Sequence, residues 1–104
     1  MAAELQIEVE EAEGGVLLTI IDSARLSLLL PRGTARKLLD AIDACMKTGE
    51  RRTTRTVDVW RAAADTPLFG VHIGLQSASW TCPAVQAWDL DGLADELESL
   101  LAER

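Results

Sequence analysis

The sequence predicts an α+β fold with two layers. An antiparallel sheet of about six strands, or two sheets that abut, carries two helices on one face, in a duplicated βββα-βββα order. Three observations support this prediction. Apolar residues alternate with polar ones in short segments and recur at helical spacing in two longer segments. Residues 26–38 align with residues 85–97, each a strand-like run followed by a helix start and an amphipathic helix. A chain of 104 residues with 48% hydrophobic residues suits a single α+β domain, 1–104, with pseudo-repeats 1–49 and 50–104.

Three strands are predicted to open the first repeat. Residues 4–10 alternate between apolar and charged side chains, as expected for a half-buried strand with glutamates on its outer face. The glycine pair at 14–15 predicts a tight hairpin turn. The apolar run 16–21 then predicts a central strand. A turn at 22–24 and a strand at 25–30 complete an antiparallel meander.

A helix is predicted to follow from Pro31, because proline is tolerated at the first helical position. Its apolar stripe consists of Ala35, Leu38, Leu39, Ile42, Cys45 and Met46. Lys47 suits the negative end of the helix dipole, and Gly49 suits the residue that ends the helix. We expect Cys45 and the second cysteine, Cys82, to be reduced and structural.

The second repeat is predicted to contain three strands, two connections and a helix. In chain order these are a strand at 53–61, a loop at 62–67, a strand at 68–76, a connection at 77–83, a short strand at 84–88 and a helix from residue 90. Asp89 is the predicted N-cap of this helix, and Leu90 aligns with Pro31.

The charge is unevenly distributed along the chain. The net charge is −7. Residues 1–31 and 62–104 are acidic, whereas residues 32–61 hold eight basic and four acidic side chains. This balance makes binding to nucleic acid unfavourable, because that affinity depends on lysine and arginine neutralising phosphates. There is no apolar run long enough for a membrane span and no signal-peptide pattern, so we expect a cytoplasmic protein and no membrane partner.

The sequence contains no recognisable catalytic constellation. His72 is the single histidine, and it has no serine or cysteine nucleophile at a known spacing. The run 89–92 places its glycine too early for a calcium-binding loop, and helix capping explains its aspartates. We therefore predict no catalytic residues, no metal site and no cofactor, and hence a protein that is not an enzyme.

One face of the strand predicted at 68–76 carries few large side chains. Gly70 and Gly74 flank His72, and Trp60 is predicted to point to the same outer face because its valine neighbours face inward. This face is either an interface for a partner or a second copy, or a surface that the loop 77–83 covers with its tryptophan.

The order of elements resembles the duplicated strand-meander-plus-helix units of the positive cofactor four, Pur and Whirly group of single-strand-binding proteins. The resemblance extends over most of the chain, but it concerns only the topology, since the chain contains no sequence motif of that group. It implies a basic, aromatic sheet face on which bases stack. In this sequence the candidate basic patch consists of Lys47, Arg51, Arg52 and Arg55, with Trp60 as the candidate aromatic residue. The chain departs from that group in its net charge and in having four aromatic residues, Trp60, Phe69, Trp80 and Trp88.

The leading prediction is a protein-interaction module, with a homodimer as the expected assembly. It would regulate or inhibit a partner that has a basic surface, in the manner of small acidic anti-defence proteins that mimic nucleic acid. The candidate partner-binding residues are Glu8, Glu10, Glu11, Glu13, Trp60, His72, Asp95 and Glu96. The alternative is single-stranded nucleic-acid binding through the basic residues and Trp60.

Overall fold

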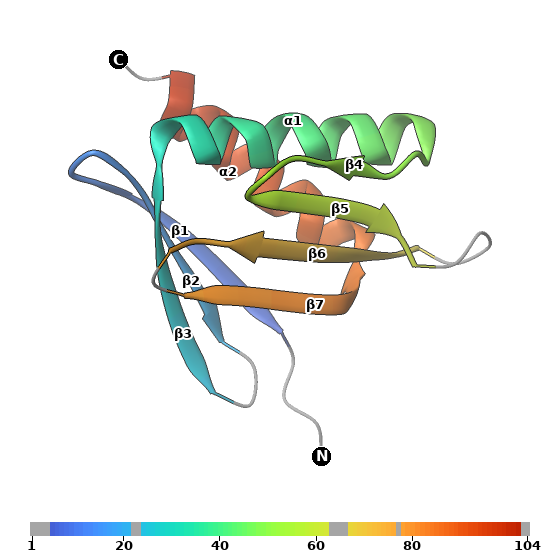
Figure 1. The fold of residues 1–104 in the computed structure, drawn as a ribbon, viewed down its shortest axis with the longest axis horizontal. Helices are drawn as coiled ribbons and strands as arrows, with labels where there is room; N and C mark the ends of the chain where they lie inside the picture. Colours follow the sequence, from blue (N-terminus) through green and yellow to red (C-terminus); the bar gives the residue numbers. More distant parts are fainter. Residues whose placement is uncertain (1–4, 22–23, 63–66, 77, 103–104) are drawn as a thin grey trace.

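The computed structural model describes residues 5–21, 24–62, 67–76 and 78–102. Within them the chain forms seven strands and two helices, drawn in Figure 1. In chain order they are β1 (Gln6–Ala12), β2 (Gly15–Ile21), β3 (Arg25–Pro31), α1 (Arg32–Thr48), β4 (Arg52–Thr53), β5 (Val57–Arg61), β6 (Leu68–Gly74), β7 (Ser79–Gln86) and α2 (Ala87–Ala102). The α+β class is confirmed. The predicted turn at 22–24 lies mostly outside the described residues.

The first sheet has the order β1-β2-β3 and is antiparallel, as the meander predicted. Val9, Leu18 and Leu28 lie opposite one another across the three strands, and the last two are buried. Gly14 turns the β1–β2 hairpin with a φ of 81°, which favours glycine. A Cβ on Gly15 would lie 1.9 Å from the carbonyl oxygen of Leu30, so only glycine fits there.

Helix α1 confirms the predicted apolar stripe, with one shift at its start. Ala35, Leu38 and Ile42 are fully buried. Pro31 is the N-cap residue and the last residue of β3, so the helix begins at Arg32. Gly49 ends the helix in the left-handed conformation, and its N–H donates to the Cys45 carbonyl at 2.7 Å.

The second sheet has four antiparallel strands in the order β4-β5-β6-β7. The single strand predicted at 53–61 is a hairpin instead. The Thr54 N–H donates to the Val57 carbonyl at 2.7 Å, while the Thr54 hydroxyl accepts from the Val57 N–H at 3.0 Å. This side-chain bond favours a turn over a continuous strand.

Strand β7 corrects the predicted connection at 77–83 and short strand at 84–88. Inward-facing Trp80 and Cys82 pair with buried residues of β6, and polar residues alternate with them. Pro83 had indicated a break. It is tolerated because β7 is an edge strand and its pairing with β6 is irregular between Phe69 and Val71.

Helix α2 begins earlier than predicted. Its first residue is Ala87, whose N–H donates to the Pro67 carbonyl at 2.9 Å. Asp89 therefore lies in the first turn and is not the N-cap, although its charge still suits the positive end of the helix. The alignment of Leu90 with Pro31 was accordingly out of register.

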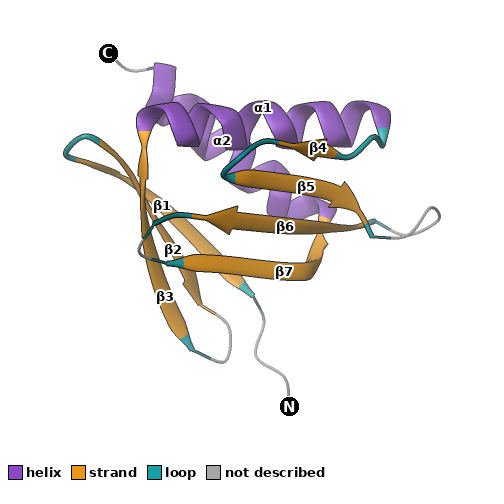
Figure 2. Cartoon of the chain, in the orientation of Figure 1, coloured by secondary structure: helices purple, strands orange, loops and turns teal. Residues whose placement is uncertain are grey.

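The strands form two antiparallel sheets, which is the second of the two predicted arrangements, and not one sheet of about six strands (Figure 2). The second half also carries four strands where the duplicated order expected three. Helix α1 packs on both sheets, mainly on β5, and α2 packs on α1, β1 and β7. The buried side chains of both sheets and both helices form one cluster. The Arg32 guanidinium donates to the Leu101 carbonyl at 2.9 Å, which ties the start of α1 to the end of α2.

Candidate functional site

Three of the predicted acidic residues lie together beside strand β1. Glu8 and Glu10 are exposed on β1, an outer strand of the first sheet. With Glu96 of α2 they line a hollow of about 420 Å³, which also contains Arg25. We call Glu8, Glu10 and Glu96 the acidic edge. None of the three carboxylates takes part in an ion pair among the described residues.

The other predicted acidic residues lie outside this hollow. Glu11 lies near the end of β1, opposite Val16 of β2, and Glu13 lies in the turn of the β1–β2 hairpin. Asp95 is exposed on α2 beside Glu96 in the chain, yet it does not line the hollow. The acidic character therefore extends from the acidic edge towards the hairpin tip and along α2.

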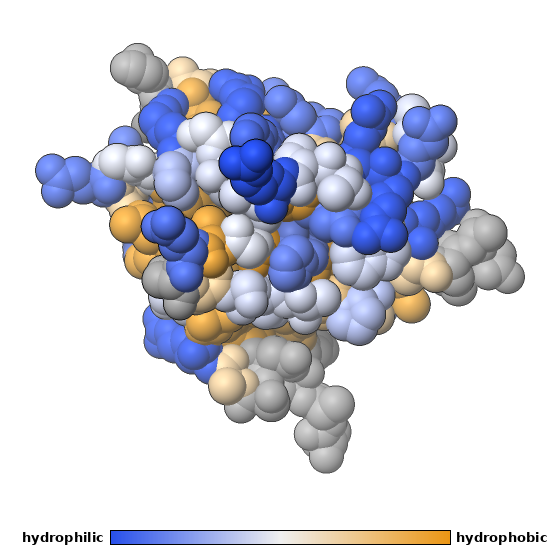
Figure 3. Space-filling view, in the orientation of Figure 1, coloured by the Kyte–Doolittle hydropathy of each residue, from blue (hydrophilic) through white to orange (hydrophobic). Residues whose placement is uncertain are grey.

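Trp60 lies on the outer face of the second sheet, as the alternation predicted. It is opposite Gly70, and a Cβ on Gly70 would lie only 2.0 Å from the indole ring. The Arg51 guanidinium lies over the ring, 5.2 Å from its centroid. Trp80 does not cover this face, because it faces inward opposite buried Ile73. The covering groups are thus Trp60 and Arg51 themselves, and pale and blue atoms predominate over β5, β6 and β7 (Figure 3).

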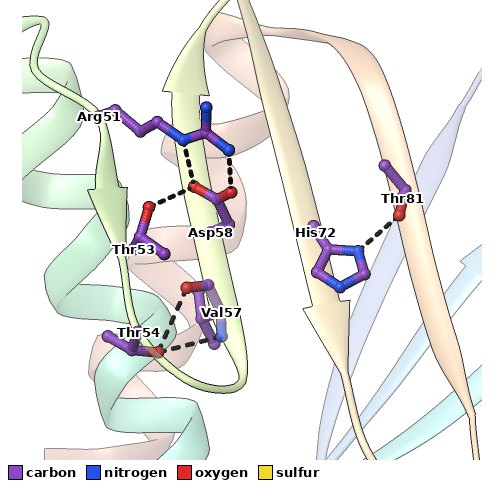
Figure 4. A network of polar contacts seen from close by, with 7 residues as sticks. All are labelled: Arg51, Thr53, Thr54, Val57, Asp58, His72 and Thr81. Carbon is purple, nitrogen blue, oxygen red and sulfur yellow. Dashed lines mark hydrogen bonds and ion pairs between the residues drawn. The ribbon is translucent and has the colours of Figure 1, made fainter.

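Asp58 is a member of this face that the sequence analysis missed. It accepts hydrogen bonds from Arg51 and from the Thr53 hydroxyl, the latter at 2.9 Å (Figure 4). The Arg51 guanidinium, through this hydrogen bond, is the main reason that the pKa of Asp58 is lowered. The signal in the sequence was a carboxylate between two inward valines, at a position that must face outward with Trp60.

His72 sits at the centre of the same face. It lies opposite Asp58 on β5 and Thr81 on β7, and its Nδ1 is 2.6 Å from the Thr81 hydroxyl (Figure 4). The hydroxyl and the ring nitrogen can exchange donor and acceptor roles with the tautomer. The arrangement holds the imidazole in place on an open sheet face.

The four predicted basic residues point to different parts of the molecule. Arg51 is paired with Asp58 on the outer face. Arg52 lines a groove with residues of α1. Lys47 is exposed in the last turn of α1, and Arg55 is exposed in the β4–β5 turn.

Burial raises the pKa of the Cys45 thiol, while Arg61 and Arg52 act in the opposite direction.

Comparison of the chain with protein-family models, curated proteins and solved structures finds no match. Neither α1 nor α2, the helices of the described residues, has the length and apolar character needed to cross a membrane. In the described ranges, no three His, Cys, Asp or Glu side chains come together in a way that could hold a metal ion.

Proposed function

We propose that this chain is a non-enzymatic protein-interaction module that binds a basic partner surface through its acidic edge. The observation that carries this proposal is the convergence of Glu8, Glu10 and Glu96, from two distant parts of the chain, on one hollow. Such a surface attracts lysine- and arginine-rich partners and speeds their association. A partner that normally binds nucleic acid would be blocked by a module of this kind, which would make the protein an inhibitor or regulator in the cytoplasm.

The acidic edge also lies on an edge strand. Strand β1 pairs only with β2 among the described strands, so it offers backbone groups as well as carboxylates. Charged side chains on such a strand oppose pairing between identical copies of it, because the glutamates repel one another. They favour a partner that brings positive charge.

The nucleic-acid alternative is less favoured by the geometry of Trp60. Base stacking needs an open aromatic face and free positive charge. Here Gly70 lies beneath the indole and Arg51 lies over it, and Arg51 is paired with Asp58. Binding of single strands would have to displace Arg51 from both contacts.

The proposal is tested by removing the acidic edge. We expect Glu8→Gln, Glu10→Gln and Glu96→Gln together to weaken binding of an isolated basic partner about tenfold, since exposed charge pairs contribute about 0.2–1 kcal/mol each. Partners are first captured from the native host and identified by mass spectrometry, and the affinity of each is then measured by calorimetry at several salt concentrations.

A matched control removes three carboxylates elsewhere. Asp43→Asn, Glu50→Gln and Glu98→Gln change the net charge equally at exposed positions outside the hollow. This variant should bind with nearly wild-type affinity. Binding that is insensitive to salt and equal in both variants would contradict the proposal. Light scattering of the unbound protein tests the inferred homodimer separately.

A further inference from the structure

A second, differently charged groove lies between helix α1 and strand β4. It has a volume of about 330 Å³. Helix α1 contributes Lys37, Asp40, Ala41 and Ala44, and the β4–β5 hairpin contributes Arg52 and Thr53. Helix and strand run alongside each other in Figure 1. The two alanines give the groove a narrow apolar floor between polar rims.

The strand that borders this groove has unused backbone groups. Because the Thr54 N–H donates to the Val57 carbonyl, these two residues are a hydrogen-bonded pair. Bonded and non-bonded pairs alternate along an antiparallel ladder. Thr53 and Asp58 therefore form a pair without hydrogen bonds between their backbones. The N–H and C=O groups of Thr53 point away from β5, towards the groove. Strand β4 pairs with no other described strand on that side.

The groove carries more positive than negative charge. Lys37 and Arg52 line it, with Asp40 as the one carboxylate. Among the described residues, neither Lys37 nor Arg52 takes part in an ion pair. An acidic ligand complements this rim.

We propose that the groove binds an extended, acidic peptide segment of a partner protein, which adds to the second sheet as a further strand beside β4. Backbone hydrogen bonds to Thr53 would supply affinity, and Lys37 and Arg52 would select a carboxylate. From Lys37 to Ala44 the helix spans about 10 Å, the length of about three residues of strand. The segment recognised is therefore short. This site is separate from the acidic edge and of opposite charge.

The test uses a short peptide of alternating glutamate and valine, titrated into the ¹⁵N-labelled protein. We expect amide shifts at Thr53, Ala41 and Ala44, and slower hydrogen exchange at Thr53. The double variant Lys37→Gln with Arg52→Gln should bind about tenfold more weakly, because it removes both cations. The charge-matched variant Arg36→Gln with Arg61→Gln changes two exposed cations outside the lining of both the groove and the hollow, and it should bind like the wild type.

Two further peptides separate strand addition from charge attraction. A peptide methylated on the backbone nitrogens of one edge cannot pair along that edge, so one of the two edge-methylated versions should lose binding. Equal binding by both versions, or by the two charge variants, would overturn the proposal, as would absence of binding at millimolar peptide. Groove shifts that follow protein concentration without peptide would identify a second copy as the occupant and also overturn it. Shifts confined to Glu8 and Glu10 would place the peptide on the acidic edge and not in the groove, and would also overturn the proposal.

Discussion

Gly70 permits Trp60 to lie against the second sheet. A methyl group at position 70 would overlap indole atoms at 2.0 to 2.5 Å. We predict that Gly70→Ala lowers the free energy of unfolding by about 1–3 kcal/mol, because the ring must move off the sheet and release Arg51. Urea denaturation followed by circular dichroism measures this change.

The partner residue supplies the control for this prediction. In a Trp60→Ala background the overlap disappears, so Gly70→Ala should then be close to neutral, and the two substitutions should couple strongly in a double-mutant cycle. Gly74→Ala is a second comparison, since its Cβ would meet only the tip of the His72 ring at 3.1 Å. A Gly70→Ala cost that persists without the indole would contradict the argument.

The residues of this face could be predicted only in part. Alternation along β5 was enough to place Trp60 outside, because Val57 and Val59 had to face inward. The pairing of Arg51 with Asp58 could not be foreseen, because it exists only once β4 folds back beside β5. Likewise, Glu96 reaches the glutamates of β1 through the packing of α2, which no local pattern records.

At the scale of elements, periodicity succeeded where segments were long. Both helices, the first meander and β6 follow from apolar spacing. Most of their predicted inner residues are buried, while Ile7, Val9, Met46 and Leu100 are half-buried. Short elements were harder. The threonine-rich run before β5 has strand propensity throughout, yet a hydroxyl bond at Thr54 makes it turn. Pro83 concealed β7, because its tolerance depends on an edge position that only the assembled sheet defines.

Two glycines, one inside a helix and one that ends a helix, predict opposite effects of the same substitution. Gly92 lies within α2 with open space where a Cβ would be, so Gly92→Ala should stabilise the protein by about 1 kcal/mol. Gly49 ends α1 with a φ of 79°, where a side chain costs about 1–2 kcal/mol, so Gly49→Ala should destabilise it. Urea midpoints of the two variants measure both effects, and a shift of the same sign in both would show that local conformation does not decide them.

The whole molecule depends on one core that both sheets share. Helix α1 contacts strands of both sheets, and α2 contacts β1 from one and β7 from the other. The apolar faces of both sheets are covered by the same two helices (Figure 1), so the buried side chains of the two sheets belong to one core. This arrangement separates the acidic edge from the groove beside β4 while keeping both on one rigid body of packed elements.

A shared core predicts that the two sheets unfold together. Leu97 is fully buried on α2, so Leu97→Ala should lower the free energy of unfolding by about 2–5 kcal/mol through lost burial and a residual cavity. In a Trp88→Phe background, which removes the exposed tryptophan of α2, indole fluorescence reports on Trp60 and Trp80 in the second sheet. Hydrogen exchange at Leu18 and Leu28 reports on the first. Both signals should shift to the same lower denaturant midpoint. The surface control Leu29→Ala, where the side chain is 53% exposed, should shift the midpoint little. Separate midpoints for the two sheets would mean that residues 1–49 and 50–104 are independent units, and the argument from a common core would then fail.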